Sequence, residues 1–81
     1  MTPMHLKISR AAGGVVSVRS WVSDPANPAE GFESLELYRA KDEAALVLYL
    51  KQLRTEGYEV KVVDREGLDP GLQRAVSEGA D

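Results

Sequence analysis

The sequence predicts an α+β domain: a four-stranded, mostly antiparallel sheet (β-β-β-α-β) with one long helix on one face and a short C-terminal helix. Residues 41–58 contain the only long helical apolar period, with Leu46, Leu50 and Leu53 spaced by three or four positions. Four shorter segments around them alternate apolar and polar side chains, as strands with one buried face do. At 81 residues, the chain is expected to form a single domain, 1–81.

The first two strands are predicted on either side of a glycine turn. Residues 5–10 alternate, with Leu6 and Ile8 toward the core, and residues 1–3 are expected to fray. Gly13 and Gly14 supply the positive φ that a tight hairpin needs. Residues 15–22 make the second strand. Its core side is predicted to carry Val16, Val18, Ser20 and Val22, and its outer side Val15, Ser17, Arg19 and Trp21.

Residues 23–33 are predicted to form a loop. They include Pro25 and Pro28, and proline cannot donate to a strand ladder and restricts the residue before it. About eleven residues is long for a hairpin connection, and loops of that length are either functional or mobile. Phe32 then either folds beneath the loop or is an exposed anchor for a partner.

The third and fourth strands are predicted on either side of the long helix. In residues 34–39, Leu35 and Leu37 are expected to face the core, with Glu36 and Tyr38 facing outward. Residues 58–63 form the fourth strand. A strand–helix–strand connection places its two strands parallel, and we expect the fourth strand beside the first.

The two helices are expected to pack on each other. Val47 and Leu48 make the first half of the long helix apolar nearly all round, so it needs a second cover, from the C-terminal segment or from another subunit. Asp69 followed by Pro70 is typical of a helix start. That short helix, 70–78, is predicted to stop at Gly79.

The composition weighs against several function classes. The chain has no cysteine, which excludes disulfides, thiolate nucleophiles and thiolate metal sites. His5 is the only histidine and has no recognisable partner, so we expect no enzyme, no metal and no cofactor. No apolar run approaches the ~18 residues that span a bilayer. We therefore expect a cytoplasmic protein without a membrane partner.

The open face of the predicted sheet is the candidate binding surface. It collects outward-facing tryptophan, tyrosine and arginine, the residue types that most often anchor protein interfaces. We expect a small bacterial or phage accessory protein that binds another protein, or a second copy of itself as a homodimer. The expected partner-binding residues are Trp21, Arg19, Tyr38, Lys7, Lys61 and Phe32.

Two alternatives remain open for that surface. Aromatic side chains flanked by bases on an open sheet can stack nucleobases. A single-stranded nucleic acid would use Lys7, Arg19, Trp21, Tyr38 and Lys61, although Glu36 and Glu59 on the same face weigh against it. In the other alternative, these side chains only cover the sheet and have no partner.

One segment resembles part of a known family. Residues 45–63 combine a helix rich in leucine that follows Ala45, then Gly57-Tyr58, then the strand EVKVV. This order is similar to the first half of a SPOR domain, a bacterial peptidoglycan-binding module that repeats a strand–helix–strand unit. The resemblance covers about a quarter of the chain and lacks the second unit, so it implies shared geometry between helix and strand and no shared ligand.

Overall fold

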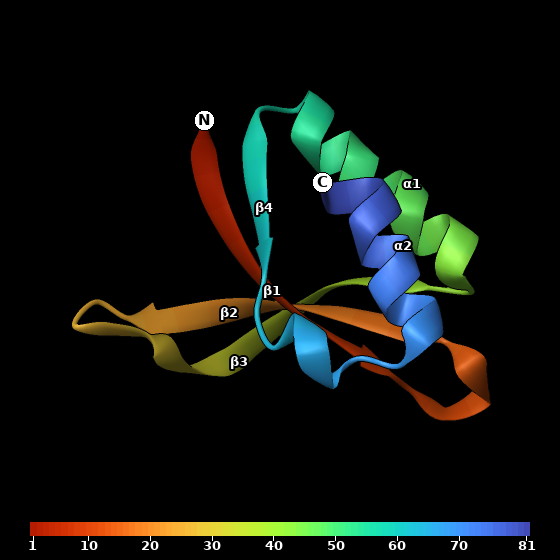
Figure 1. The fold of residues 1–81 in the computed structure, drawn as a ribbon, viewed down its shortest axis with the longest axis horizontal. Coiled ribbons are helices and arrows are strands. Elements are labelled where there is room, and N and C mark those ends of the chain that lie inside the picture. The colour runs from red at the N-terminus through yellow and green to blue at the C-terminus, as the bar shows by residue number, and fades with distance from the viewer.

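A computed structural model of the chain describes residues 1–27 and 30–81 and has the predicted α+β architecture. Figure 1 shows both helices on the same side of the sheet, and a long β2–β3 hairpin that reaches out beyond them. In chain order, the elements are β1 (Thr2–Arg10), the 3₁₀ turn η1 (Ala12–Gly14), β2 (Val16–Asp24), β3 (Asn27–Ala40), α1 (Glu43–Thr55), β4 (Tyr58–Val62), the 3₁₀ turn η2 (Arg65–Gly67) and α2 (Pro70–Ala80).

The sheet is mixed, with the strand order β3-β2-β1-β4. Strands β1, β2 and β3 form an antiparallel meander, and β4 pairs with β1 in parallel. The predicted place of the fourth strand, beside the first, is therefore confirmed. The expectation that residues 1–3 fray is wrong, because Thr2 already pairs with Tyr58 and its N–H donates to the Gly57 carbonyl at 3.2 Å.

The core lies between one face of the sheet and both helices. In β1 and β2 the buried apolar side chains alternate along each strand, as a sheet covered on one face requires. Helix α1 contributes its leucine stripe, and α2 adds a second row. The fully buried side chains include Leu6, Ile8, Val16, Val18, Leu46, Leu50, Leu72 and Val76.

Both helices begin at an aspartate cap. The Asp42 carboxylate accepts the Ala45 N–H, and the Asp69 carboxylate accepts the Leu72 N–H, each at 2.9 Å. Such caps satisfy N–H groups that have no partner inside the helix. Helix α1 is therefore shorter than 41–58, and Gly57, with φ 98°, ends it in the left-handed region.

Helix α2 supplies part of the cover that α1 needs. A Cβ on Gly79 would lie 2.8 Å from the Leu50 Cβ and 3.2 Å from the Val47 carbonyl oxygen, so only glycine allows this approach. The predicted stop at Gly79 is therefore wrong: the helix continues to Ala80 because this glycine serves packing and not termination. Leu48 receives no such cover and remains exposed.

The predicted loop 23–33 is mostly strand. Strand β2 runs to Asp24, a tight turn occupies Pro25 and Ala26, and β3 starts at Asn27. The Asp24 carboxylate accepts the Ala26 N–H at 2.9 Å, which closes the turn in the manner of an Asx-turn. Pro25 lies in the turn and therefore breaks no ladder. Residues 28 and 29 of the predicted loop lie outside the described residues.

The predicted facing of residues 34–39 is partly inverted. Tyr38 pairs with the buried Val18 and therefore points to the helix side, while Glu36 pairs with Arg19 and points to the open side. The two lie on opposite faces because the register shifts between Val18 and Arg19, which inserts one extra residue into β3. The expectation that Leu35, Leu37 and Val22 join the core is wrong, since all three are exposed. Val22 does lie on the predicted helix side of β2, but it is not covered there.

Candidate functional site

The open face of the sheet carries the basic residues that the sequence placed there. His5 and Lys61 are register partners across β1 and β4, and Lys7 and Arg19 are partners across β1 and β2. Strand alternation puts all four on the face away from the helices, because their neighbours Leu6 and Val18 are buried beneath the helices. The structure thus brings three of the predicted cations, from Lys7, Arg19 and Lys61, onto one surface.

Each of these three cations has a carboxylate within 4 Å. Lys7 Nζ lies 3.3 Å from Asp64, Arg19 Nε lies 3.5 Å from Glu33, and Lys61 Nζ lies 3.8 Å from Glu59. The face therefore has little surplus positive charge with which to attract phosphates. This pairing weighs against a nucleic-acid surface.

A second polar group on the open face is centred on Glu36. The Ser17 hydroxyl, on a residue only 6% exposed, donates to Glu36 at 2.6 Å, and Arg39 donates to the same carboxylate at 3.0 Å. The Ser17 hydroxyl first, and then Arg39, lower the pKa of Glu36. A carboxylate held in its ionised form in this way is a weak base, so the Ser17–Glu36 pair has no feature of an activated nucleophile.

Trp21 lies on the open face where the hairpin leaves the body of the sheet. Its indole covers Gly31 on the neighbouring strand: a Cβ at Gly31 would lie 2.8 Å from Trp21 Nε1 and closer still to the Val22 carbonyl oxygen. An aromatic ring over a strand glycine compensates for the missing side chain. Among the described residues, Trp21 Nε1 and Ser23 Oγ are buried polar atoms without a hydrogen-bond partner.

The other face of the same hairpin is apolar and uncovered. Val22 and Phe32 are register partners on the helix side, but neither helix reaches this part of the hairpin (Figure 1). Phe32 is 61% exposed and Val22 44%, and farther along β3, Leu35 is 72% and Leu37 41% exposed. Trp21 and Phe32 also contribute to an open groove of about 680 Å³ along the hairpin. We call Trp21, Val22, Phe32, Leu35 and Leu37 the hairpin surface.

Tyr38 joins the hairpin surface to the helical layer. Its ring stacks on that of Tyr49 in α1, with 4.3 Å between the ring centroids and 7° between the ring planes. It therefore lies on the opposite side of the sheet from Lys7, Arg19 and Lys61. The structure separates the predicted binding residues into an open-face group and, on the helix side, Phe32 and Tyr38.

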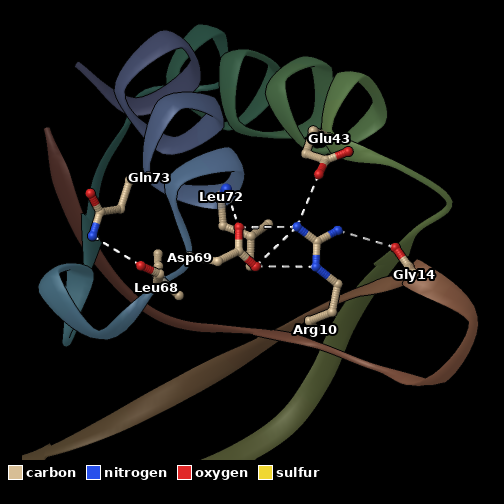
Figure 2. A network of polar contacts seen from close by, with 7 residues as sticks. All are labelled: Arg10, Gly14, Glu43, Leu68, Asp69, Leu72 and Gln73. Atoms are coloured by element: carbon tan, nitrogen blue, oxygen red, sulfur yellow. Dashed lines mark hydrogen bonds and ion pairs between the residues drawn. The ribbon is translucent and has the colours of Figure 1, made fainter.

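Figure 2 shows a polar network around Arg10 that the sequence did not predict. Arg10, the last residue of β1, donates to Glu43 at 2.9 Å and to Asp69 at 3.1 Å, and its other guanidinium nitrogen donates to the Gly14 carbonyl at 3.4 Å. These contacts tie the N-termini of both helices to the end of one strand. No spacing in the sequence links residues so far apart, although the Asp69 cap itself was predicted.

Arg10 and the helix ends fix the ionisation of these two carboxylates. The backbone N–H of Glu43 and then Arg10 lower the pKa of Glu43, and the Leu72 N–H and then Arg10 lower that of Asp69. Hydrogen bonds to Glu43 and Asp69 in turn raise the pKa of Arg10. All three groups are charged at neutral pH, and their contacts hold the end of β1 against the N-termini of both helices.

The described residues contain no group of three or more metal-ligating side chains. Within the same part of the chain, no helix is both long and apolar enough to cross a bilayer.

No family model, curated protein or solved structure matches this chain. Residues 45–63 do form a helix followed by a strand, as the resemblance to half of a SPOR domain implies, but an antiparallel meander precedes them.

Proposed function

We propose that this chain is a small non-catalytic module that binds another protein through the hairpin surface. The observation that carries the proposal is the distribution of exposed large apolar side chains. Among the described residues there are seven, and five of them, Val22, Phe32, Leu35, Leu37 and Tyr38, lie on β2 or β3. Exposed large apolar side chains that gather on one part of a small domain are typical of an interaction site.

Energetics favour a partner at this surface. Complete burial of a phenylalanine or leucine side chain gains about 1.5–3 kcal/mol, and both Phe32 and Leu35 are more than half exposed. The paired charges on the open face, such as Lys7 with Asp64, would have to lose water or separate to make a contact. The hairpin surface is therefore the better contact surface. Of the residues predicted on the open face, Trp21 belongs to it. We keep the expected cytoplasmic location as part of the proposal, and fractionation of host cells tests it.

Site-specific photo-crosslinking in the native host tests the proposal. A benzoylphenylalanine at position 32 is expected to give discrete adducts, which mass spectrometry of the crosslinked peptides identifies. The matched control carries the same probe at position 48, because Leu48 is at least as exposed as Phe32 but lies on α1. Adding Leu35→Ser to the position-32 probe is expected to reduce its adducts, while circular dichroism stays unchanged. Equal labelling from positions 32 and 48 would refute the proposal.

A further inference from the structure

The two edges of the sheet differ greatly in length. Strand β4 closes one edge with five residues, and β3 forms the other edge with fourteen. An edge strand presents unpaired N–H and C=O groups, which another strand can join. A long edge that also carries exposed Phe32 and Leu35 is the part of the sheet best suited to strand addition.

Natural edges are usually protected by charges, prolines or bulges at their centre. Two of the three register shifts between β2 and β3 fall near the centre of β3, on either side of Arg19, and the third lies between Ser23 and Asp24. However, the residues at the two central shifts include two exposed leucines, Leu35 and Leu37, together with the acidic Glu33 and Glu36, and no lysine or proline. A bulge that exposes leucine provides a contact and does not repel an incoming strand.

The order of charges along β3 favours an identical strand in the antiparallel direction. Acidic residues Glu30 and Glu33 lie in its first half, and Arg39 and Lys41 lie next to its end and just after it. The acidic residue of its second half, Glu36, is already paired with Arg39 at 3.0 Å. Antiparallel pairing brings the acidic half of each copy to the basic end of the other, whereas parallel pairing would bring like charges together. The internal ion pairs of Glu33 and Arg39 leave these side chains about half exposed, so each can face a second opposite charge.

The aromatic residues specify a register. Phe32 and Tyr38 both point to the helix side, and each lies three positions from Leu35 along the sequence. If Leu35 lies on a two-fold axis, Phe32 of each copy is directly opposite Tyr38 of the other. Aromatic pairs across antiparallel strands stabilise a sheet, and here each new pair would extend the existing Tyr38–Tyr49 stack.

We propose that two copies of this chain pair antiparallel along their β3 edges, with Leu35 on the two-fold axis, to form one continuous eight-stranded sheet. This inference rests on the proposed protein-binding function and names the partner as a second copy. The two-fold arrangement is closed, so it ends at a dimer. The remaining edges are the short β4 strands.

The absence of cysteine from the chain allows a direct test by disulfide trapping. We expect Leu35→Cys to form an intermolecular disulfide at micromolar concentration, at least tenfold faster than the exposed control Leu48→Cys. A mixture of Phe32→Cys and Tyr38→Cys chains should form mixed disulfides faster than either variant alone. Light scattering of the wild-type chain should give twice the 8.8 kDa chain mass, and Leu35→Lys should restore the monomer.

The outcomes separate this inference from the proposed function. A monomer at 100 µM together with equal trapping of Leu35→Cys and Leu48→Cys overturns the dimer. If photo-adducts at position 32 then contain a different protein, the binding function stands without the dimer. If position 32 gives no more adduct than position 48, the binding function falls as well. A dimer in which Leu35→Cys is not trapped overturns the β3 register.

Discussion

At the scale of single residues, the hairpin depends on one close contact between a ring and a glycine. Gly31 leaves space for the Trp21 indole, and the Val22 carbonyl oxygen approaches the same position from the backbone. The indole N–H is buried there without a partner. An unpaired buried donor costs about 1–3 kcal/mol, so packing of the ring must offset that cost.

Substitution of Gly31 is expected to destabilise the chain. In Gly31→Ala the new Cβ meets backbone at Val22, which cannot move aside, and overpacking of this kind costs about 1–3 kcal/mol. The urea midpoint should fall, and Trp21 fluorescence should shift to longer wavelength as the ring is displaced. Gly67→Ala is the control, because its nearest neighbour is the exposed Asp64 carboxylate, which can swing away. Equal stability of both variants would contradict the packing argument.

At the scale of elements, Arg10 holds together the ends of β1, α1 and α2. Its contacts to Glu43 and Asp69 join a strand end to two helix N-termini, where carboxylates are already favoured by the helix dipoles. The Arg10 charge is partly screened by water, so its role is better measured by pH dependence than by a single stability value.

Arg10→Met is expected to lower the thermal midpoint and to weaken the acid dependence of stability. Without the guanidinium, the pKa values of Glu43 and Asp69 should rise toward their ordinary values, although their backbone N–H bonds remain. Carbon-detected NMR titration of the two carboxyl groups measures this rise. Lys61→Met is the matched control, since its ion pair to Glu59 is half exposed at both ends. A titration unchanged by Arg10→Met would show that the helix ends alone set these pKa values.

Local signals in the sequence predicted the helices well. The predicted cap at Asp69 and the leucine stripe of α1 depend on residues only a few positions apart. The hairpin was missed because Pro25 and Pro28 indicated a loop, whereas Pro25 lies in the turn between the strands. The facing of Tyr38 was missed for a different reason. β3 has one extra residue at each of two register shifts beside Arg19, and no residue type in this segment marks their positions. The predicted open-face charges were placed correctly because β1 is regular along its whole length.

At the scale of the whole molecule, carboxylates stabilise the folded chain at neutral pH. The pKa values of Glu36, Glu43, Asp69 and Asp81 are lowered by the Ser17 hydroxyl, the Glu43 N–H, the Leu72 N–H and Arg65, respectively. The unfolded chain therefore binds protons at higher pH than the folded chain does. The stabilisation is complete above the ordinary values of 4.5 for Glu and 3.8 for Asp, and it is lost as the pH falls through the lower folded values.

We expect the urea midpoint to stay nearly constant between about pH 7 and pH 5 and to decrease steadily below about pH 4.5. Fluorescence-detected unfolding at a series of pH values measures it. A midpoint that increased on acidification would contradict the direction of these four shifts.

The central position of β1 has a consequence for synthesis on the ribosome. β1 is the first strand of the chain to be made, yet its partner β4 and the Asp69 contact of Arg10 come from the last third of the chain. The β2–β3 ribbon can close as soon as it leaves the exit tunnel, while one side of β1 must wait until β4 has left the tunnel. The nascent polypeptide thus exposes a second unpaired strand edge, on β1, until β4 pairs with it.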